Sequence, residues 1–258
     1  ATSLYGSAGR GGGTGPRGRN YYNSETDILP FRKDLTEHYL ENGRGSRNAQ
    51  GFIDFDAIVA YNQANTEGYS GDLPFTGQLI ASNGFRDDGV NRAGLVRRAS
   101  MNSHDWVGAI SNLEYESGNW KTSIGIDLRN YTGYHYRVMN NLMGFDGYYS
   151  TGNKNSAGQI INTLVEASPF NGTGLDGPKI DYYNVGKVGW QGLNGLVEYN
   201  NETISAVLQV GGSNQSFQRL DYFDQPNNPE SDTQNQGGGY IKGGANYNID
   251  SKQNVFFN

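Results

Sequence analysis

Ser103, His104 and Asp105 are the three residue types of a hydrolase triad, in adjacent positions. Neighbouring side chains on an extended strand point to opposite faces of a sheet, whereas the members of a triad converge on one point. This spacing therefore favours polar residues near a strand end over a nucleophile with its base. The sequence contains no other grouping of acid, base and nucleophile, so we do not expect an enzyme.

The acidic segment 221–232, DYFDQPNNPESD, could hold calcium through Asp224, Glu230 and Asp232. It lacks the spacing of an EF-hand, so an acidic loop without a metal is the favoured interpretation. The chain has no cysteine, which removes disulfide scaffolds, thiol catalysis and Cys-ligated zinc or iron–sulfur sites. We therefore predict no cofactor.

The glycine-rich, basic segment near the start formally matches a dinucleotide-binding pattern at residues 13–18, GTGPRG. A phosphate loop needs a buried strand before it and a helix after it, and a P-loop needs Lys then Ser or Thr where Arg19 and Asn20 stand. Residues 1–50 are therefore predicted to be a glycine-rich basic loop with a short helix at 34–41. The net charge of −6 argues against nucleic acid as a partner.

The element that must position most polar side chains is a long hairpin over residues 103–136. A turn at 116–119 would pair Tyr115 with Trp120 and place alternate apolar residues on one face. The opposite face would carry four charged residues that we predict to face the lumen of a barrel: Glu114, Lys121, Asp127 and Arg129. The apolar band from Trp120 to Leu128 has about the 9 to 11 residues that a strand needs to cross a bilayer.

A soluble sheet has the same period of two, so alternation alone does not separate lipid from a protein core. Strand length favours the membrane, because the alternation continues through Tyr134 and Tyr136, whereas soluble strands average about five or six residues. The 38 glycines, 18 tyrosines and a mean hydropathy of −0.69 also indicate β-structure with long polar loops. Residues 52–65 could be a helix or a strand.

An internal repeat supports more hairpins of this kind: WVGAISNLEY at Trp106 recurs as WQGLNGLVEY at Trp190. A weaker hairpin follows at 240–258, so residues 95–258 are expected to form long hairpins. Short turns at 116–119, 200–203 and 250–252 then alternate with long loops at 140–187 and 215–239. This pattern predicts an all-β protein, an antiparallel transmembrane β-barrel with short periplasmic turns and long extracellular loops.

Aromatic residues stand in and near the predicted loops. Tyr131 and Tyr134 would form an interfacial girdle, which a barrel needs whatever its ligand. The loop residues fit either packing of the loops or an exposed surface that binds a ligand, because rings stack on sugars and peptides. The residues of this candidate binding surface are Tyr148, Tyr149, Tyr222, Phe223 and Asp224.

Several segments resemble TonB-dependent outer-membrane receptors that carry a carboxypeptidase-regulatory-like domain ahead of the plug. These segments are GSAGRGGGTGPRGR, DILPFRKDL, RASMNSHDW, GIDLRNYTGYHYRV, YYNVGKVGW, GGANYNI and NVFFN. The resemblance implies a receptor in the cell outer membrane, surrounded by outer-membrane lipid. Such a receptor binds a small solute, a glycan, a peptide or a metal chelate and imports it with energy from a TonB complex, in some cases under a surface lipoprotein lid.

Within that family, we expect residues 1–258 to be part of one barrel domain. The plug, the TonB-contacting segment and the closing strands have no counterpart in the sequence. The alternative is a secreted or surface-anchored β-sandwich that binds glycans or mediates adhesion through its tyrosines.

Overall fold

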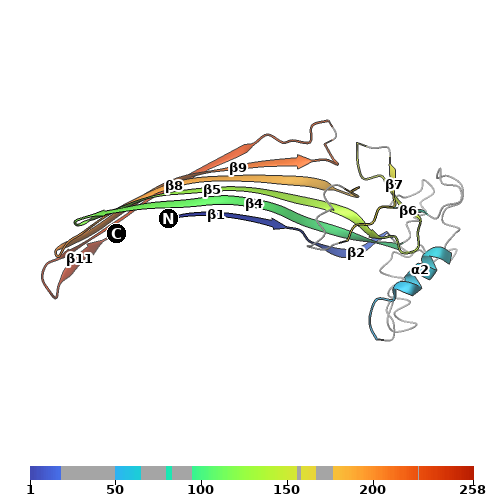
Figure 1. Ribbon diagram of the computed structural model, residues 1–258, viewed down its shortest axis with the longest axis horizontal. Helices are drawn as coiled ribbons and strands as arrows, with labels where there is room; N and C mark the ends of the chain where they lie inside the picture. The colour runs from blue at the N-terminus through green and yellow to red at the C-terminus, as the bar shows by residue number, and fades with distance from the viewer. Residues whose placement is uncertain (19–49, 65–79, 83–94, 156–157, 167–176, 226) are drawn as a thin grey trace.

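The structure is a computed structural model that describes residues 1–18, 50–64, 80–82, 95–155, 158–166, 177–225 and 227–258. The described residues form mostly antiparallel β-sheet with one short helix (Figure 1), so the all-β prediction is confirmed. No helix in this part of the chain is long and apolar enough to cross a membrane.

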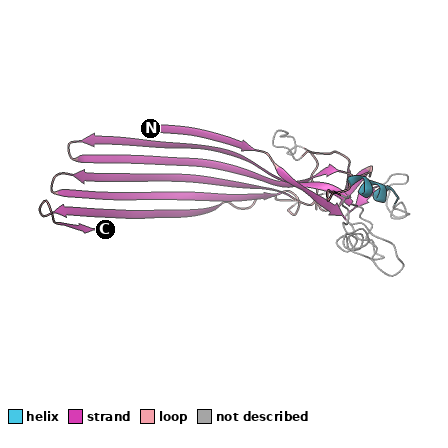
Figure 2. Cartoon of the chain, turned by 90° about the horizontal axis from the view of Figure 1, so that it is seen from below, coloured by secondary structure: helices cyan, strands magenta, loops and turns pink. Residues whose placement is uncertain are grey.

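The described strands form one eight-stranded sheet in the order β1-β4-β5-β8-β9-β10-β11, with β2 paired to β4 beyond β1. Figure 2 shows the long strands side by side, with the hairpin turns at one end. The strands are β1 (Thr2–Gly9), β2 (Gly12–Gly18), β4 (Leu95–Ser117), β5 (Trp120–Asn141), β8 (Tyr183–Asn200), β9 (Ile204–Asp221), β10 (Gln234–Asn248) and β11 (Asn254–Phe257). In the described residues this sheet is open, so closure into a barrel stays a prediction.

A second, three-stranded sheet lies at the end of the long strands away from the hairpin turns (Figures 1 and 2). Its order is β3-β6-β7, and its members are β3 (Ile80–Ser82), β6 (Gly147–Ser150) and β7 (Gln159–Ile161). Helix α2 (Phe55–Ala64) lies at the same end. It shows that the ambiguous segment 52–65 is largely helical.

The hydrophobic core of the described residues lies at this end, which we call the loop end. One cluster joins Val96 of β4 and Met139 of β5 to Tyr148 of β6 and Ile161 of β7. The loop end is therefore a packed body built on the ends of the long strands, because its apolar side chains are buried there.

The first hairpin turns more tightly than predicted. Ser117 and not Tyr115 faces Trp120, so the predicted register is wrong by two residues. Gly118 has a φ of +56°, which a two-residue hairpin turn favours and which glycine adopts without steric cost. Because side chains alternate with a period of two, this shift leaves every residue on its predicted face.

The other two predicted turns are confirmed, and each is held by a side chain. The Asn201 side-chain oxygen accepts from the Thr203 and Ile204 backbone amides at 2.9 and 2.7 Å. Asp250 does the same for Lys252 and Gln253 at 2.8 and 2.9 Å. Asn and Asp favour turns because their short side chains replace backbone hydrogen-bond acceptors.

The strands reach further than the predicted loops 140–187 and 215–239 allow. Strand β8 already begins at Tyr183, and β9 runs to Asp221 before β10 begins at Gln234. Pairing continues because neighbouring strands satisfy each other's backbone groups even where the side chains are polar.

Residues 1–18 were predicted as a loop, and this is wrong. They form β1 and β2, which pair with β4 over most of its length. Glycine-rich composition disfavours a strand locally, but an existing edge on β4 provides the hydrogen-bond partners. The helix predicted at 34–41 lies outside the described residues.

Candidate functional site

One face of the long sheet is apolar and exposed near the hairpin turns. Leu113 is 71% exposed, Ile124 57% and Leu128 45%. The strand registers place these side chains on one face with Leu4, Val107, Ile126, Leu193, Val197, Leu208, Val210 and Ile241. We call this surface the apolar face.

Aromatic residues border the apolar face at the end near the turns. Trp120 lies opposite Tyr199, with the two ring centroids 4.9 Å apart. Tyr115 and Tyr247 lie on the same face close to the same end. From Trp120 to Leu128 the apolar face extends roughly 27 Å along β5, at about 3.4 Å per residue. These nine residues lie at the lower end of the roughly 9 to 11 that a tilted strand needs to cross a bilayer.

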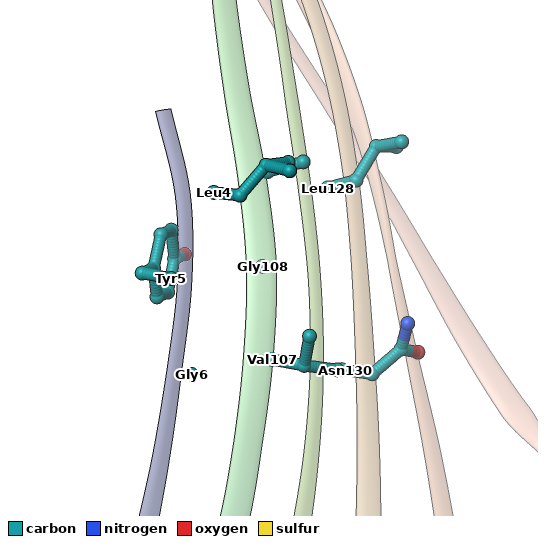
Figure 3. Close-up of a pocket in the computed structure, with 8 residues that line it drawn as sticks. Leu4, Tyr5, Gly6, Val107, Gly108, Leu128 and Asn130 are labelled. Carbon is teal, nitrogen blue, oxygen red and sulfur yellow. The ribbon is translucent and has the colours of Figure 1, made fainter. Parts of the chain in front are cut away.

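A shallow hollow of about 510 Å³ interrupts the apolar face between β1, β4 and β5. Figure 3 shows Leu4, Val107 and Leu128 around it, with Asn130 at its edge. The hollow exists because Gly6, which lines it, has no side chain to fill it.

The opposite face, which we call the charged face, holds the four predicted lumen residues together. Lys121 Nζ lies 3.0 Å from Glu116 Oε1 and 3.7 Å from Glu114 Oε2. Arg129 forms an ion pair with Asp127, with Nε donating to Oδ1 at 2.8 Å. That these residues share one face follows from the register, whereas their direction towards a lumen stays a prediction.

The charged face also carries aromatic rings. With Tyr115 opposite Trp120, Trp106 would lie on this face opposite Arg129, but Trp106 faces Tyr131, with the ring centroids 5.7 Å apart and edge to face. Arg129 instead faces Gly108 and Trp190. The repeat that aligned the two tryptophans could have revealed their shared face, since both motifs pair with the central strand β5.

Tyr131 therefore does not fit the girdle predicted for it. It lies on the charged face, opposite the face of Trp120, because odd and even positions of β5 point in opposite directions. Tyr134 shares the face of Trp120 but packs against the buried cluster at the loop end.

Two of the predicted ligand-binding rings are buried. Tyr148 is 0% exposed and Phe223 3%, so the expectation that they form an exposed surface is wrong. Tyr148 and Tyr149 also lie in β6 and not outside the strands. The loop folds into a small sheet of its own, and aromatic side chains supply the core beneath it.

The structure does bring the two predicted loops together. Phe223 O accepts from the Lys154 amide at 3.0 Å, and Lys154 Nζ lies 3.0 Å from Asp224 Oδ1. Tyr222 stacks on Tyr183, with ring centroids 4.6 Å apart. Tyr149, Tyr222 and Asp224 are half-buried or exposed, and a role for them in binding a solute stays a prediction.

The triad-like residues separate as the strand period predicts. His104 stacks on Tyr131, with centroids 5.8 Å apart, on the charged face. Asp105 lies on the opposite face and forms an ion pair with Arg10 at 2.7 Å, while Ser103 is buried on the face of Asp105. These three side chains do not converge.

The acidic loop is organised by hydrogen bonds to Asp221. Its Oδ1 accepts from the backbone amides of Phe223 and Asp224 at 3.1 and 2.9 Å, and Arg219 Nη2 donates to its Oδ2 at 3.0 Å. Among the described residues no three His, Asp or Glu side chains gather where they could hold a metal ion.

Burial alone would raise the pKa of Asp221, but the two amide donors and Arg219 outweigh it and lower that pKa. Its contribution to stability is therefore present above the ordinary Asp pKa of about 3.9, and it is lost as the pH falls through the lowered value in the folded protein. We expect Asp221→Asn to cost about 1 kcal/mol at pH 7 and progressively less as the pH falls below the ordinary Asp pKa. Denaturant unfolding over a series of pH values measures this, and a cost independent of pH would contradict it.

Comparison with known proteins gives no match to a family model, to a curated protein or to a solved structure.

Proposed function

We propose that this chain is part of a transmembrane β-barrel in the cell outer membrane, in a TonB-dependent receptor that binds a solute at the cell surface for energised import. The observation that carries the proposal is the exposed apolar face on one side of the long strands, opposite a charged face on the other.

The apolar face is suited to contact with lipid, and the charged face is suited to contact with water. A contiguous apolar surface of this extent is unfavourable in water and marks an interaction site or a membrane. Lipid tolerates Leu113, Ile124 and Leu128, while Lys121 and Arg129 on the other face avoid it. The aromatic border near Trp120 fits the interface between lipid and water. Lipid chains would also fill the hollow beside Leu4.

The receptor part of the proposal is supported by the loop end and by the sequence resemblance. The two loops contact each other and build a packed body beyond the apolar face, where a solute from outside would arrive first. The solute would be a glycan, a peptide or a metal chelate, and the partners would be a TonB complex and a surface lipoprotein lid.

A secreted or surface-anchored β-sandwich would cover the apolar face with a second sheet. Strand lengths favour the barrel, because β4 has 23 residues and β5 has 22, far more than the usual five or six.

Labelling of single cysteines tests the two faces, and the chain has no cysteine of its own. In outer-membrane vesicles, a lipid-soluble reagent should label Ile124→Cys and a water-soluble reagent should label Asp127→Cys. The reverse result would invert the faces. A protein that stays monomeric in water without detergent would support the sandwich instead.

A further inference from the structure

Three arginines from three strands gather on the charged face at the loop end. Arg17 of β2 lies beside Arg98 of β4, since Gly15 faces Arg98 and alternate residues share a face. Arg137 of β5 lies opposite Ser100, two positions from Arg98. The Ser100 hydroxyl accepts from Arg98 Nη1 at 3.1 Å and from Arg137 Nε at 3.3 Å.

Among the residues that the structure describes, a single carboxylate, that of Asp181, pairs with this cluster. Asp181 Oδ1 lies 2.7 Å from Arg17 Nη2, and its Oδ2 lies 2.8 Å from Arg137 Nη1. Asp181 is 11% exposed, so both ion pairs are largely shielded from water. In the described part of the chain, Arg98 has no carboxylate within 4.0 Å.

The Arg98 guanidinium packs against strand β2 at Gly15. A Cβ at Gly15 would lie 3.1 Å from Arg98 Cζ, so glycine at this position lets the guanidinium lie close against the strand. Burial and repulsion by Arg137 lower the pKa of Arg98. Positive charge at the cluster is therefore in excess, and an anion would relieve the repulsion.

A buried hydroxyl, that of Tyr148, lies beside Arg17, with which it interacts. No described residue accepts the proton of this hydroxyl, and Arg17 Nε is also buried without an acceptor there. Burial raises the pKa of Tyr148 to about 12, although Arg17 opposes the shift, so the phenol stays neutral and can donate a proton. A buried donor without an acceptor typically costs about 1–3 kcal/mol, and an oxyanion would supply the acceptor.

A purely structural role accounts for only part of this arrangement. The pairs of Asp181 with Arg17 and Arg137 tie β2, β5 and the segment before β8 together. Arg98 adds a hydrogen bond from Nη1 to Gly13 O at 3.2 Å. Its charge still has no carboxylate within 4.0 Å among the described residues, and no described residue accepts the proton of the Tyr148 hydroxyl, so these two groups fit an anion-binding site better than a purely structural contact.

We propose that Arg17, Arg98 and the Tyr148 hydroxyl bind one small oxyanion, a phosphate or a carboxylate group. Guanidinium groups suit both, because their N–H donors match paired oxygen atoms. The acid could be free in solution or part of a larger solute. The site does not require the sheet to lie in a membrane, so it and the receptor proposal can fail separately.

Calorimetric titration of the purified full chain in detergent tests the site, with inorganic phosphate and acetate as probes and sodium chloride at matched ionic strength as the reference. We expect saturable binding of phosphate, acetate or both. Binding of phosphate alone would indicate a phosphate site, and comparable binding of acetate would indicate a general oxyanion site. No saturable binding of either would overturn the proposal.

Variants then assign the binding to the cluster. Arg98→Gln should raise the dissociation constant of the bound anion at least about tenfold, and Tyr148→Phe should raise it a few-fold. Arg219→Gln is the matched control, because that arginine is 63% exposed and pairs with Asp221 away from the cluster. Unchanged affinity in Arg98→Gln would overturn the assignment. If that variant does not fold, Tyr148→Phe decides, because it keeps the ring and removes only the hydroxyl.

Discussion

Replacing Ile126 with arginine is expected to remove roughly 2–4 kcal/mol of stability in a bilayer. Ile126 is 44% exposed in the middle of the apolar face, where lipid would surround a new charge. The loss should fall towards the edges of the face, because arginine near an interface can reach water. Reversible unfolding in lipid vesicles, with the fraction of inserted protein measured in parallel, gives both quantities.

Ser123→Arg is the matched control for this change. Ser123 is on the same strand, about 10 Å nearer the hairpin turn, but it lies on the charged face and directly opposite Glu114. We expect this variant to insert and unfold like the original protein. Equal losses of stability in both variants would show that the strand tolerates arginine on neither face. If both variants instead insert and unfold like the original protein, that result would argue against lipid on the apolar face.

Replacing Tyr148 with serine should cost about 3–5 kcal/mol at the loop end, as truncation of a buried aromatic ring does. The ring is 0% exposed and belongs to the cluster that joins β4, β5, β6 and β7. Hydrogen exchange of the β6 and β7 amides should show the loss, because the loop end can open while the long hairpins remain paired.

Two controls separate the ring from its hydroxyl and from its position. Tyr148→Phe keeps the ring and removes a hydroxyl whose proton no described residue accepts, so in phosphate-free buffer it should leave exchange nearly unchanged. Tyr115→Ser, at a ring that is 68% exposed on the long hairpin, should not affect β6. Fast exchange in Tyr148→Phe would show that the hydroxyl and not the ring holds the loop end.

The burial of Tyr148 and Phe223 also changes how solute binding by the loops can be tested. If all four rings lay on exposed loops, replacing Tyr148, Tyr149, Tyr222 and Phe223 together would leave folding intact, but Tyr148 and Phe223 are buried at the loop end. Tyr222 and Asp224 can be changed singly without removing a fully buried side chain. Their variants are therefore the appropriate test of solute binding.

The sequence by itself determined the strand type, the turn positions and the two faces. These features depend on contacts between near neighbours: side chains alternate with a period of two, and Asn201 or Asp250 closes its turn within a few residues. An error of two residues in the register at Ser117 therefore changed the partner of every residue but the face of none.

Only the tertiary structure decided which residues meet across strands and what the loops build. Arg17 contacts Asp181 across 164 positions and Arg137 contacts it across 44, and no local pattern encodes either pair. The same holds for Tyr148, whose burial depends on β4 and β5 beneath it. The glycine-rich sequence of residues 12–18 locally favours a loop, yet this segment forms strand β2 because β4 offers it an open edge. Partners distant in the chain thus fixed the loop end and its arginine cluster, because hydrogen bonding and burial there outweigh local preference.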